Sequence, residues 1–425
     1  MGDEGTETNT RGPTVDLDPN DGEFHRGRFA TYEQLRRTRP VAFSPRHGGF
    51  WIVSDYDSVT TVARDNETFA HAYEPDAPDG ISRRGICGVP RDPRIPRQGV
   101  SEIDGPDHKA LRHALNPWFA PARVEALRPA MQAVTTWFLD EAIERGEIDL
   151  VLHYATPMPA IITLQMVGLP CDRWRDYTDF FHGTTAHRPQ DEEHAKAVLL
   201  APAIRAQLLE EANRRRSEPA DDLATVLVRH RVDGRGLSDE EIVDILWNIV
   251  AGGLDTTTAL TAWALYHLDR DLPARQVLLE RPELIPAAAE EFLRFVSPNE
   301  ALTRTVTRDI ELGGRQLHAG DVVYMSWLSA NHDEQVFEHP DELDFERSEN
   351  RHLAFGLGGH RCIGSHLART EFEVMLTEVL ERIPDYRIDV ERFVPYPPNS
   401  LMTGVASMPA SFTPGARTGP AQQPF

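Results

Sequence analysis

The chain of 425 residues contains three cysteines, Cys87, Cys171 and Cys362, and one of them has a setting suited to chemistry. Their spacing includes no CxxC pair, which disfavours a zinc ribbon or an iron–sulfur cluster. Cys362 lies between Gly359 and Gly364, and glycines let a backbone approach a large flat group closely. A lone buried cysteine is usually only a small apolar side chain. The flanking glycines make Cys362 the one that needs a functional explanation.

A helix is predicted to begin directly after Cys362, with an inner face of apolar residues. These are Leu367, Ala368, Phe372, Met375, Leu376 and Val379. The dipole and the free amides of a helix N-terminus would favour a thiolate over a thiol at Cys362. No histidine is evidently placed to activate this sulfur as a nucleophile. The setting therefore favours a thiolate ligand of a haem iron.

The segment around Cys362 resembles the haem-binding loop of the cytochromes P450. The family pattern F-x-x-G-x-x-x-C-x-G is met by Phe355, Gly358, Cys362 and Gly364. Four further family motifs occur in the family's order, from about residue 104 to residue 362 and beyond. The resemblance implies haem b as cofactor, with Phe355 among its binding residues and Cys362 as the iron ligand. It also implies the family's mainly α fold, a triangular helical prism with a small β-rich lobe.

Gly252, Gly253, Asp255 and Thr256 resemble the family's oxygen-activation motif in a long central helix. Two glycines in mid-helix cost about 1 kcal/mol each relative to alanine, so they need a structural reason. The resemblance implies that they leave room for dioxygen over the iron. Thr256 is expected to hydrogen-bond back to the carbonyl of Gly252, and Asp255 to pass protons inward. Taken alone, the motif also fits a kinked helix with a capped interior threonine.

Glu291 and Arg294 form an E-x-x-R pair on a predicted helix. This spacing by itself indicates an exposed ion pair worth about 0.2–0.5 kcal/mol. The resemblance implies instead that the pair is buried and joined by an arginine from a later loop, where Arg347 fits the family pattern. These three residues are predicted to support the haem loop structurally, because such a network fixes local geometry more than it adds stability.

The two propionates of haem need cationic partners once they leave bulk water. His108 and Arg112 match two family positions, and their spacing of four residues places them on one helix face. Arg304, on a predicted strand, and His360, two residues before the cysteine, match the remaining positions. The resemblance implies that all four side chains hold the propionates.

Glu300 lies in the loop after the E-x-x-R helix, which in this family passes over the haem and lines the substrate cavity. With Val250, Ala251 and Ala301 it is predicted to contact the substrate. A carboxylate in this position is costly to bury unless a polar partner meets it. Two partners are open: an amine, amide or hydroxyl of the substrate, or an arginine that would close a lid. The candidate arginines are Arg83, Arg84 and Arg97.

The resemblance implies a monooxygenase that inserts one atom of dioxygen into a small to medium organic substrate, such as a natural product or terpenoid-like compound. One alternative is a family member that catalyses oxidative coupling or ring closure without oxygen insertion. Another is a non-catalytic haem sensor or carrier, which Asp255 and Thr256 argue against because a carrier needs no proton relay. Electrons from NAD(P)H are expected through a separate ferredoxin and ferredoxin reductase. A basic patch for the acidic ferredoxin is predicted at Lys109, Arg112 and Arg361.

Composition excludes several other classes of protein. The chain has 67 acidic and 44 basic residues and a net charge of −23, which argues against a nucleic-acid binder. The first ten residues, MGDEGTETNT, lack the apolar segment of a secretory signal, so a cytoplasmic location without disulfides is predicted. The apolar stretch from Ile245 to Leu268 carries Asp255 at its middle, which makes a membrane span costly.

The candidate residues need long helices to position them. Ser238 and Glu241 form a capping box that predicts a helix from Ser238 to about His267, and helical periodicity dominates from Asp107 to about Arg382. Strand-like runs lie nearer the ends, at 41–53, at 302–325 with a turn at 313–314, and at 385–412.

The chain is therefore predicted as a single domain over residues 21–412. Residues 1–20 and 413–425 are predicted as tails, because neither segment can bury enough apolar surface to fold alone. Residues 71–100 are rich in glycine, proline and arginine. Such a long irregular segment is usually functional or disordered.

Overall fold

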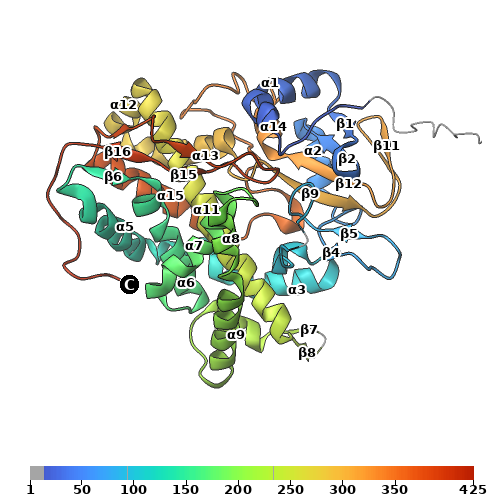
Figure 1. Ribbon diagram of the computed structural model, residues 1–425, viewed down its shortest axis with the longest axis horizontal. Coiled ribbons are helices and arrows are strands. Elements are labelled where there is room, and N and C mark those ends of the chain that lie inside the picture. The colour runs from blue at the N-terminus through green and yellow to red at the C-terminus, as the bar shows by residue number, and fades with distance from the viewer. Residues whose placement is uncertain (1–13, 93, 233) are drawn as a thin grey trace, which may run out of the picture.

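The computed structural model describes residues 14–92, 94–232 and 234–425. Helices form most of this part of the chain, and the larger sheet lies to one side of them, near the N-terminal helix (Figure 1). The α-helices are α1 Gly22–Thr38, α2 Tyr56–Arg64, α3 Gly105–Leu115, α4 Pro121–Glu125, α5 Arg128–Ile143, α6 Pro157–Val167, α7 Trp174–Thr185, α8 Glu192–Val198, α9 Ala201–Ser217, α10 Leu223–Arg229, α11 Asp239–Arg270, α12 Leu272–Glu280, α13 Ile285–Val296, α14 Trp327–Asn331 and α15 Ser365–Arg382.

The strands are short, and most of them pair as small ribbons or sheets. They are β1 Val41–Ser44, β2 Phe50–Val53, β3 Phe69–Ala70, β4 Tyr73–Glu74, β5 Arg83–Arg84, β6 Glu147–Asp149, β7 Arg231–Val232, β8 Arg235–Gly236, β9 Ala301–Val306, β10 Ile310–Leu312, β11 Arg315–Leu317, β12 Val322–Ser326, β13 Arg387–Ile388, β14 Val394–Pro395, β15 Val405–Ser407 and β16 Pro409–Ser411. The mainly α architecture with a small β-rich lobe is confirmed.

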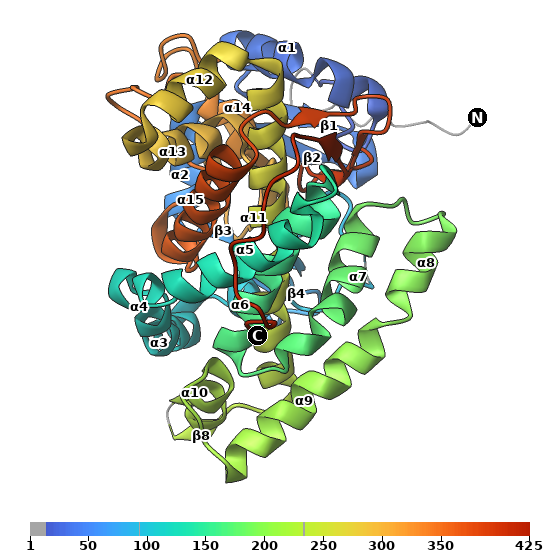
Figure 2. The same cartoon turned by 90° about the vertical axis from the view of Figure 1, so that its left-hand side faces the viewer.

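Helix α11 runs through the middle of the molecule, with other helices packed around it (Figure 2). Its 32 residues span about 48 Å at 1.5 Å per residue. The predicted capping box is present, because Ser238 accepts a hydrogen bond from the Glu241 backbone and the Glu241 side chain accepts one from Ser238. Helices α6, α9 and α15 pack directly against α11. Among the described residues, none of the helices combines the length and hydropathy needed to cross a bilayer.

The largest sheet has the strand order β1-β2-β12-β9-β3. Strands β1 and β2 form an antiparallel hairpin, and β12 pairs parallel to β2 and antiparallel to β9. All five residues of β12 are buried, which is typical of a central strand covered on both faces. The sheet fixes β9, the strand that carries Arg304, beside the helical part.

Both predicted tails are partly packed onto the body. Leu17 is buried and the Val15 backbone donates to the Phe43 carbonyl, so residues 14–20 extend the core at β1, while residues 1–13 lie outside the described residues. Residues 413–425 run along α5, where Asp140 accepts hydrogen bonds from the backbone of Thr418 and Gly419. Neither segment has a core of its own, but each finds hydrogen-bond partners on the body.

Candidate active site

A cavity of about 380 Å³ lies between α11, α15, α3 and β9. This volume falls within the usual range for small-molecule sites. Segments far apart in the sequence meet here, because α11 forms one wall and the cysteine loop with the start of α15 forms another. The predicted residues that line it are His108, Arg112, Ala251, Gly252, Gly253, Asp255, Thr256, Arg304, Phe355, His360 and Cys362.

The cysteine loop is held by its own backbone and by glycine. The Cys362 N–H donates to the Phe355 carbonyl at 2.8 Å, which closes the loop on itself. Gly358 has a φ of +71°, and a Cβ there would lie 2.8 Å from the Ala63 carbonyl oxygen. The loop therefore needs a glycine at this position to pack against α2, and that packing presents Cys362 to the cavity.

The surroundings of Cys362 shift the pKa of its thiol in both directions. Burial raises the pKa of this thiol above its ordinary value, although the Gly364 N–H and the nearby Arg112 and Arg361 act to lower it. Desolvation of the charged form thus outweighs the helix N-terminus in the protein alone. Arg112 and Arg361 alone do not offset the cost of burying a thiolate. A metal ion bound to the sulfur would add the positive charge that favours the thiolate.

The two glycines of α11 have different roles. A Cβ on Gly252 would meet nothing within 4 Å, so this residue leaves open space at the cavity wall. A Cβ on Gly253 would lie 2.4 Å from Oγ1 of Thr163, a residue of α6. Gly253 is therefore required for the close packing of α6 on α11, and only Gly252 fits the predicted role of making room.

Asp255 and Thr256 occupy the positions expected for a proton relay. The Thr256 hydroxyl donates to the Gly252 carbonyl at 3.0 Å, as predicted. Asp255 is buried, and its Oδ2 accepts a hydrogen bond from the Thr185 hydroxyl at 2.7 Å. Its Oδ1 lies 3.8 Å from Nδ1 of His182. Burial acts to lower the pKa of His182, but the Asp255 carboxylate outweighs this and raises that pKa above its ordinary value.

Three imidazole rings that line the cavity are stacked on one another. The ring of His360 lies between those of His71 and His108, with ring centroids 3.5 Å and 3.7 Å apart. Asp104 accepts from His360 Nε2 at 3.1 Å and from the His71 backbone. His71 was not predicted from the sequence, because its position after β3 belongs to no motif and only the folded chain brings it to the site.

The part of the cavity around these rings and Arg304, its cationic end, fits a ligand that bears carboxylates. Nε of Arg304 and Nε2 of both His71 and His108 are buried without a hydrogen-bond partner among the described residues. Burial lowers the pKa of Arg304 to about 9, and burial together with the neighbouring His360 lowers that of His108 to about 4. The unpaired N–H of Arg304 indicates a missing acceptor, and each unpaired imidazole nitrogen can donate to the same group in one of its tautomers. The side chains present therefore fit the two propionates of a haem.

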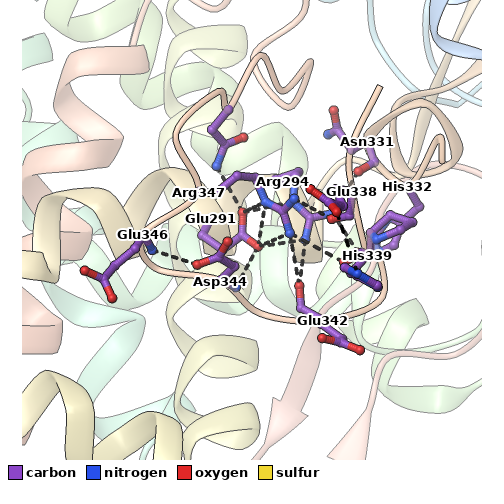
Figure 3. Close-up of polar contacts among 12 residues, drawn as sticks. Glu291, Arg294, Asn331, His332, Glu338, His339, Glu342, Asp344, Glu346 and Arg347 are labelled. Atoms are coloured by element: carbon purple, nitrogen blue, oxygen red, sulfur yellow. Dashed lines mark hydrogen bonds and ion pairs between the residues drawn. The ribbon is translucent and has the colours of Figure 1, made fainter. Parts of the chain in front are cut away.

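The predicted E-x-x-R network is present, with Glu291 at its centre (Figure 3). Arg294 donates to both carboxylate oxygens of Glu291 at 2.9 and 2.8 Å, and Arg347 donates to Glu291 at 3.1 Å. Burial acts to raise the pKa of Glu291, but these arginines hold it below its ordinary value. All three side chains are buried or nearly so.

One of the four residues predicted to contact the substrate lines the cavity. Ala251 lines the cavity, whereas Val250, Glu300 and Ala301 are not among its lining residues. Glu300 is fully buried and turns to α1, where the Tyr32 hydroxyl donates to its Oε1 at 3.1 Å. The Arg28 Nε lies 3.6 Å from its Oε2. Among the described residues, Glu300 pairs with Arg28 and with none of the three arginines predicted as alternatives, Arg83, Arg84 and Arg97, because a buried carboxylate takes the polar partners that surround it.

Comparison with known proteins gives consistent matches over nearly the whole chain. The family model "Cytochrome P450" matches residues 171–409. The chain is 34% identical to steroid C26-monooxygenase of Mycobacterium tuberculosis (strain ATCC 25618 / H37Rv), over 96% of this chain and 100% of that protein. It is 34% identical to nocardicin C N-oxygenase of Nocardia uniformis subsp. tsuyamanensis, over 90% and 94%. The crystal structure of CYP109E1 from Bacillus megaterium in complex with testosterone has a TM-score of 0.80 at 28% identity, and the alignment covers 92% of this chain and 99% of that one.

Proposed function

Because the chain belongs to the cytochrome P450 family, we propose that it is a monooxygenase whose substrate is an uncharged, mainly apolar molecule of about steroid size. The observation that carries this proposal is the cavity itself, where a cysteine thiol, a cationic end with unpaired donors and the Asp255–Thr256 pair meet. Similar proteins named for a steroid support this substrate class.

The residues that would hold haem b are distributed over the cavity. Cys362 would supply the thiolate that ligates the iron, and Phe355 would help to hold the cofactor from the cavity wall. The propionates would bind the unpaired donors of His71, His108 and Arg304, together with Arg112 and His360. A bound haem would supply the iron at which dioxygen is reduced and one of its oxygen atoms passed to the substrate.

The protein's own part in the reaction is to move protons and to exclude water. The Thr256 hydroxyl and the Asp255 carboxylate both line the cavity, so a proton held on Asp255 can reach the reacting oxygen through Thr256. His182 lies behind Asp255 and is held by the Ala406 carbonyl at 3.2 Å and the Tyr396 hydroxyl at 2.9 Å. It would restore the proton that Asp255 gives up.

Electrons would come from NAD(P)H through a ferredoxin reductase and a ferredoxin. Lys109 and Arg361 are exposed, and Arg112 is half-buried between them and the cavity. A local cationic surface on a chain of net charge −23 would direct an acidic ferredoxin to the cysteine side of the cavity.

The assignment of Cys362 is tested by absorption spectroscopy of the reduced protein under carbon monoxide. The wild-type protein should show the strongly red-shifted Soret band of a thiolate-bound haem, and Cys362→Ala should abolish it. Cys87→Ala and Cys171→Ala are the matched controls and should retain the band. Persistence of the band in Cys362→Ala would show that another residue ligates the iron.

The proton relay is tested by the amount of hydrogen peroxide released per reducing equivalent consumed. Thr256→Ala should keep haem and substrate binding but release at least several times more peroxide, because protons no longer reach the reacting oxygen in order. Thr258 provides the control, since its hydroxyl donates to Leu254 and Ala155 away from the cavity. An unchanged ratio in Thr256→Ala rules out the relay.

A further inference from the structure

Asn248 lies on α11 one helical turn before Gly252, and it lines the cavity. Its Oδ1 accepts two hydrogen bonds from Ser101, one from the backbone N–H at 3.3 Å and one from the hydroxyl at 3.0 Å. A backbone N–H can only donate, so the side-chain atom that faces Ser101 must be the carbonyl oxygen. The orientation of the Asn248 amide is therefore fixed by chemistry.

The amide nitrogen of Asn248 consequently carries two N–H donors at the cavity wall. Among the residues that the structure describes, none accepts a hydrogen bond from this nitrogen, and it is not among the fully buried unpaired atoms. Asn248 is half-buried. Its donors are thus open to the cavity, where a bound molecule can reach them.

Ser101 is itself held firmly in place. The short helix η2, Gly99–Glu102, packs directly on α11, and a Cβ on Gly99 would lie 2.6 Å from the Asp244 carbonyl oxygen. The Glu102 carboxylate is fully buried and accepts hydrogen bonds from the backbone of Ile86 at 2.9 Å and of Gln98 at 2.8 Å. Arg91 pairs with the same carboxylate at 3.0 Å. These contacts tie Ile86, Arg91 and Gln98 to Glu102 and keep Ser101 against Asn248.

Three other polar groups of the cavity wall are already engaged. The Asp255 carboxylate accepts from Thr185, the Gln98 amide donates to the Pro96 carbonyl, and the Thr184 hydroxyl donates to the Phe180 carbonyl. Val100 and Ile249, next to Ser101 and Asn248, are apolar. A ligand at this wall therefore meets an apolar surface with an oriented donor, which suits an uncharged molecule that carries an oxygen acceptor.

We propose that Asn248 recognises the substrate by donating a hydrogen bond to one of its carbonyl or hydroxyl oxygens, and that Ser101 is the positioning residue for this amide. The inference rests on the proposed function and narrows its substrate class. Four residues of helix rise by about 6 Å. The recognised oxygen is therefore bound about 6 Å along α11 from Gly252, the residue that leaves open space for the reaction.

The test is a Soret titration of the haem-loaded enzyme with testosterone and with two analogues, one without the 17-hydroxyl and one without the 3-ketone. Wild-type enzyme should bind testosterone about five- to tenfold more tightly than one of these analogues, the expected effect of one hydrogen bond. Asn248→Asp keeps the shape and the bonds from Ser101 but removes the donors. It should weaken testosterone binding about tenfold and remove the preference over that analogue.

Two further variants complete the experiment. Asn248→Leu should act like Asn248→Asp without introducing a charge, and Ser101→Ala should weaken binding about two- to threefold, because the backbone N–H remains to orient the amide. Thr184→Val is the matched control at the same wall and should bind testosterone like the wild-type enzyme.

Three results would overturn the proposal. Unchanged affinity and preference in both Asn248 variants would exclude the hydrogen bond, and an equal loss in Thr184→Val would indicate a general disturbance of the cavity. No Soret shift with any of the three steroids would contradict the substrate class. Since the carbon monoxide band that depends on Cys362 is measured separately, each of these failures is distinguishable from a failure of the proposed function.

Discussion

Two clusters of buried polar and charged side chains differ in how fully their polar atoms are paired. In the network of Glu291, Arg294 and Arg347, all five N–H bonds of Arg294 have acceptors. These are the two Glu291 oxygens and the carbonyls of Asn331, Pro340 and Glu342. The network is complete within the protein.

The cluster of His71, His108 and Arg304 at the cavity is incomplete, because some of its buried polar atoms have no hydrogen-bond partner among the described residues. Arg304 is buried, donates to its neighbour's carbonyl and leaves its Nε unpaired. His71 and His108 each leave one ring nitrogen unpaired. Burying an unpaired polar group is costly, so a chain tolerates it where a ligand supplies the missing partner. The difference separates a cluster that is complete without a ligand from the one that we propose binds the cofactor.

The largest expected effect comes from breaking the complete network. Arg294→Met leaves Glu291 as a buried carboxylate without its main partner, and such a change costs about 3–5 kcal/mol of unfolding free energy. Urea unfolding followed by circular dichroism measures it. Arg281→Met removes the exposed pair with Glu346 and should give no measurable change. Equal stability of Arg294→Met and wild type would show that the network does not support the fold.

A substitution in the incomplete cluster should affect haem binding rather than the stability of the cofactor-free protein. Arg304→Leu removes an unpaired cation, so the unfolding midpoint of the cofactor-free protein should not fall. Haem loss should become at least tenfold faster, because a charge-assisted hydrogen bond worth about 1.5–3 kcal/mol is missing. Transfer of haem to apomyoglobin measures the rate. A lower midpoint with unchanged haem loss would reverse the assignment of the two clusters.

The sequence predicted well those contacts that depend on local spacing. His108 and Arg112 share a helix face because they are four residues apart, and Glu291 and Arg294 are three apart. The capping box at Ser238 was equally local.

Contacts between distant segments were not predictable in this way. His71, the Thr185–Asp255 hydrogen bond and the Ser101–Asn248 contact each join parts of the chain that only the tertiary fold brings together. The partners of Glu300 were not predicted for a related reason. This residue precedes β9 in an irregular segment, so no strand periodicity sets the direction of its side chain, and its partners Tyr32 and Arg28 belong to a helix far away in sequence.

The smallest expected effect concerns Glu290, the neighbour of Glu291 on α13. Glu290 is fully paired as well, with Arg369 on α15 and with His352. Its carboxylate accepts from Arg369 at 2.8 Å and from His352 at 3.1 Å. Burial acts to raise the pKa of Glu290, but these partners lower it to about 2. Because the folded pKa lies below the unfolded value of about 4.3, the interaction stabilises the fold above that pH and is lost as pH falls toward 2.

Glu290→Gln should therefore lower the unfolding free energy by about 1–2 kcal/mol at pH 7, a value reduced for solvent screening of a partly exposed group. The deficit should shrink steadily as the pH falls from about 4.3 toward 2, because the unfolded chain takes up its proton near pH 4.3 while the folded carboxylate keeps its charge until about pH 2. Urea unfolding at several pH values measures it, with Glu283→Gln as the exposed control on the neighbouring turn. A deficit that stays constant with pH would mean that the charge of Glu290 contributes nothing to stability. Of these two carboxylates on α13, only Glu291 would then stabilise the fold through its ion pairs.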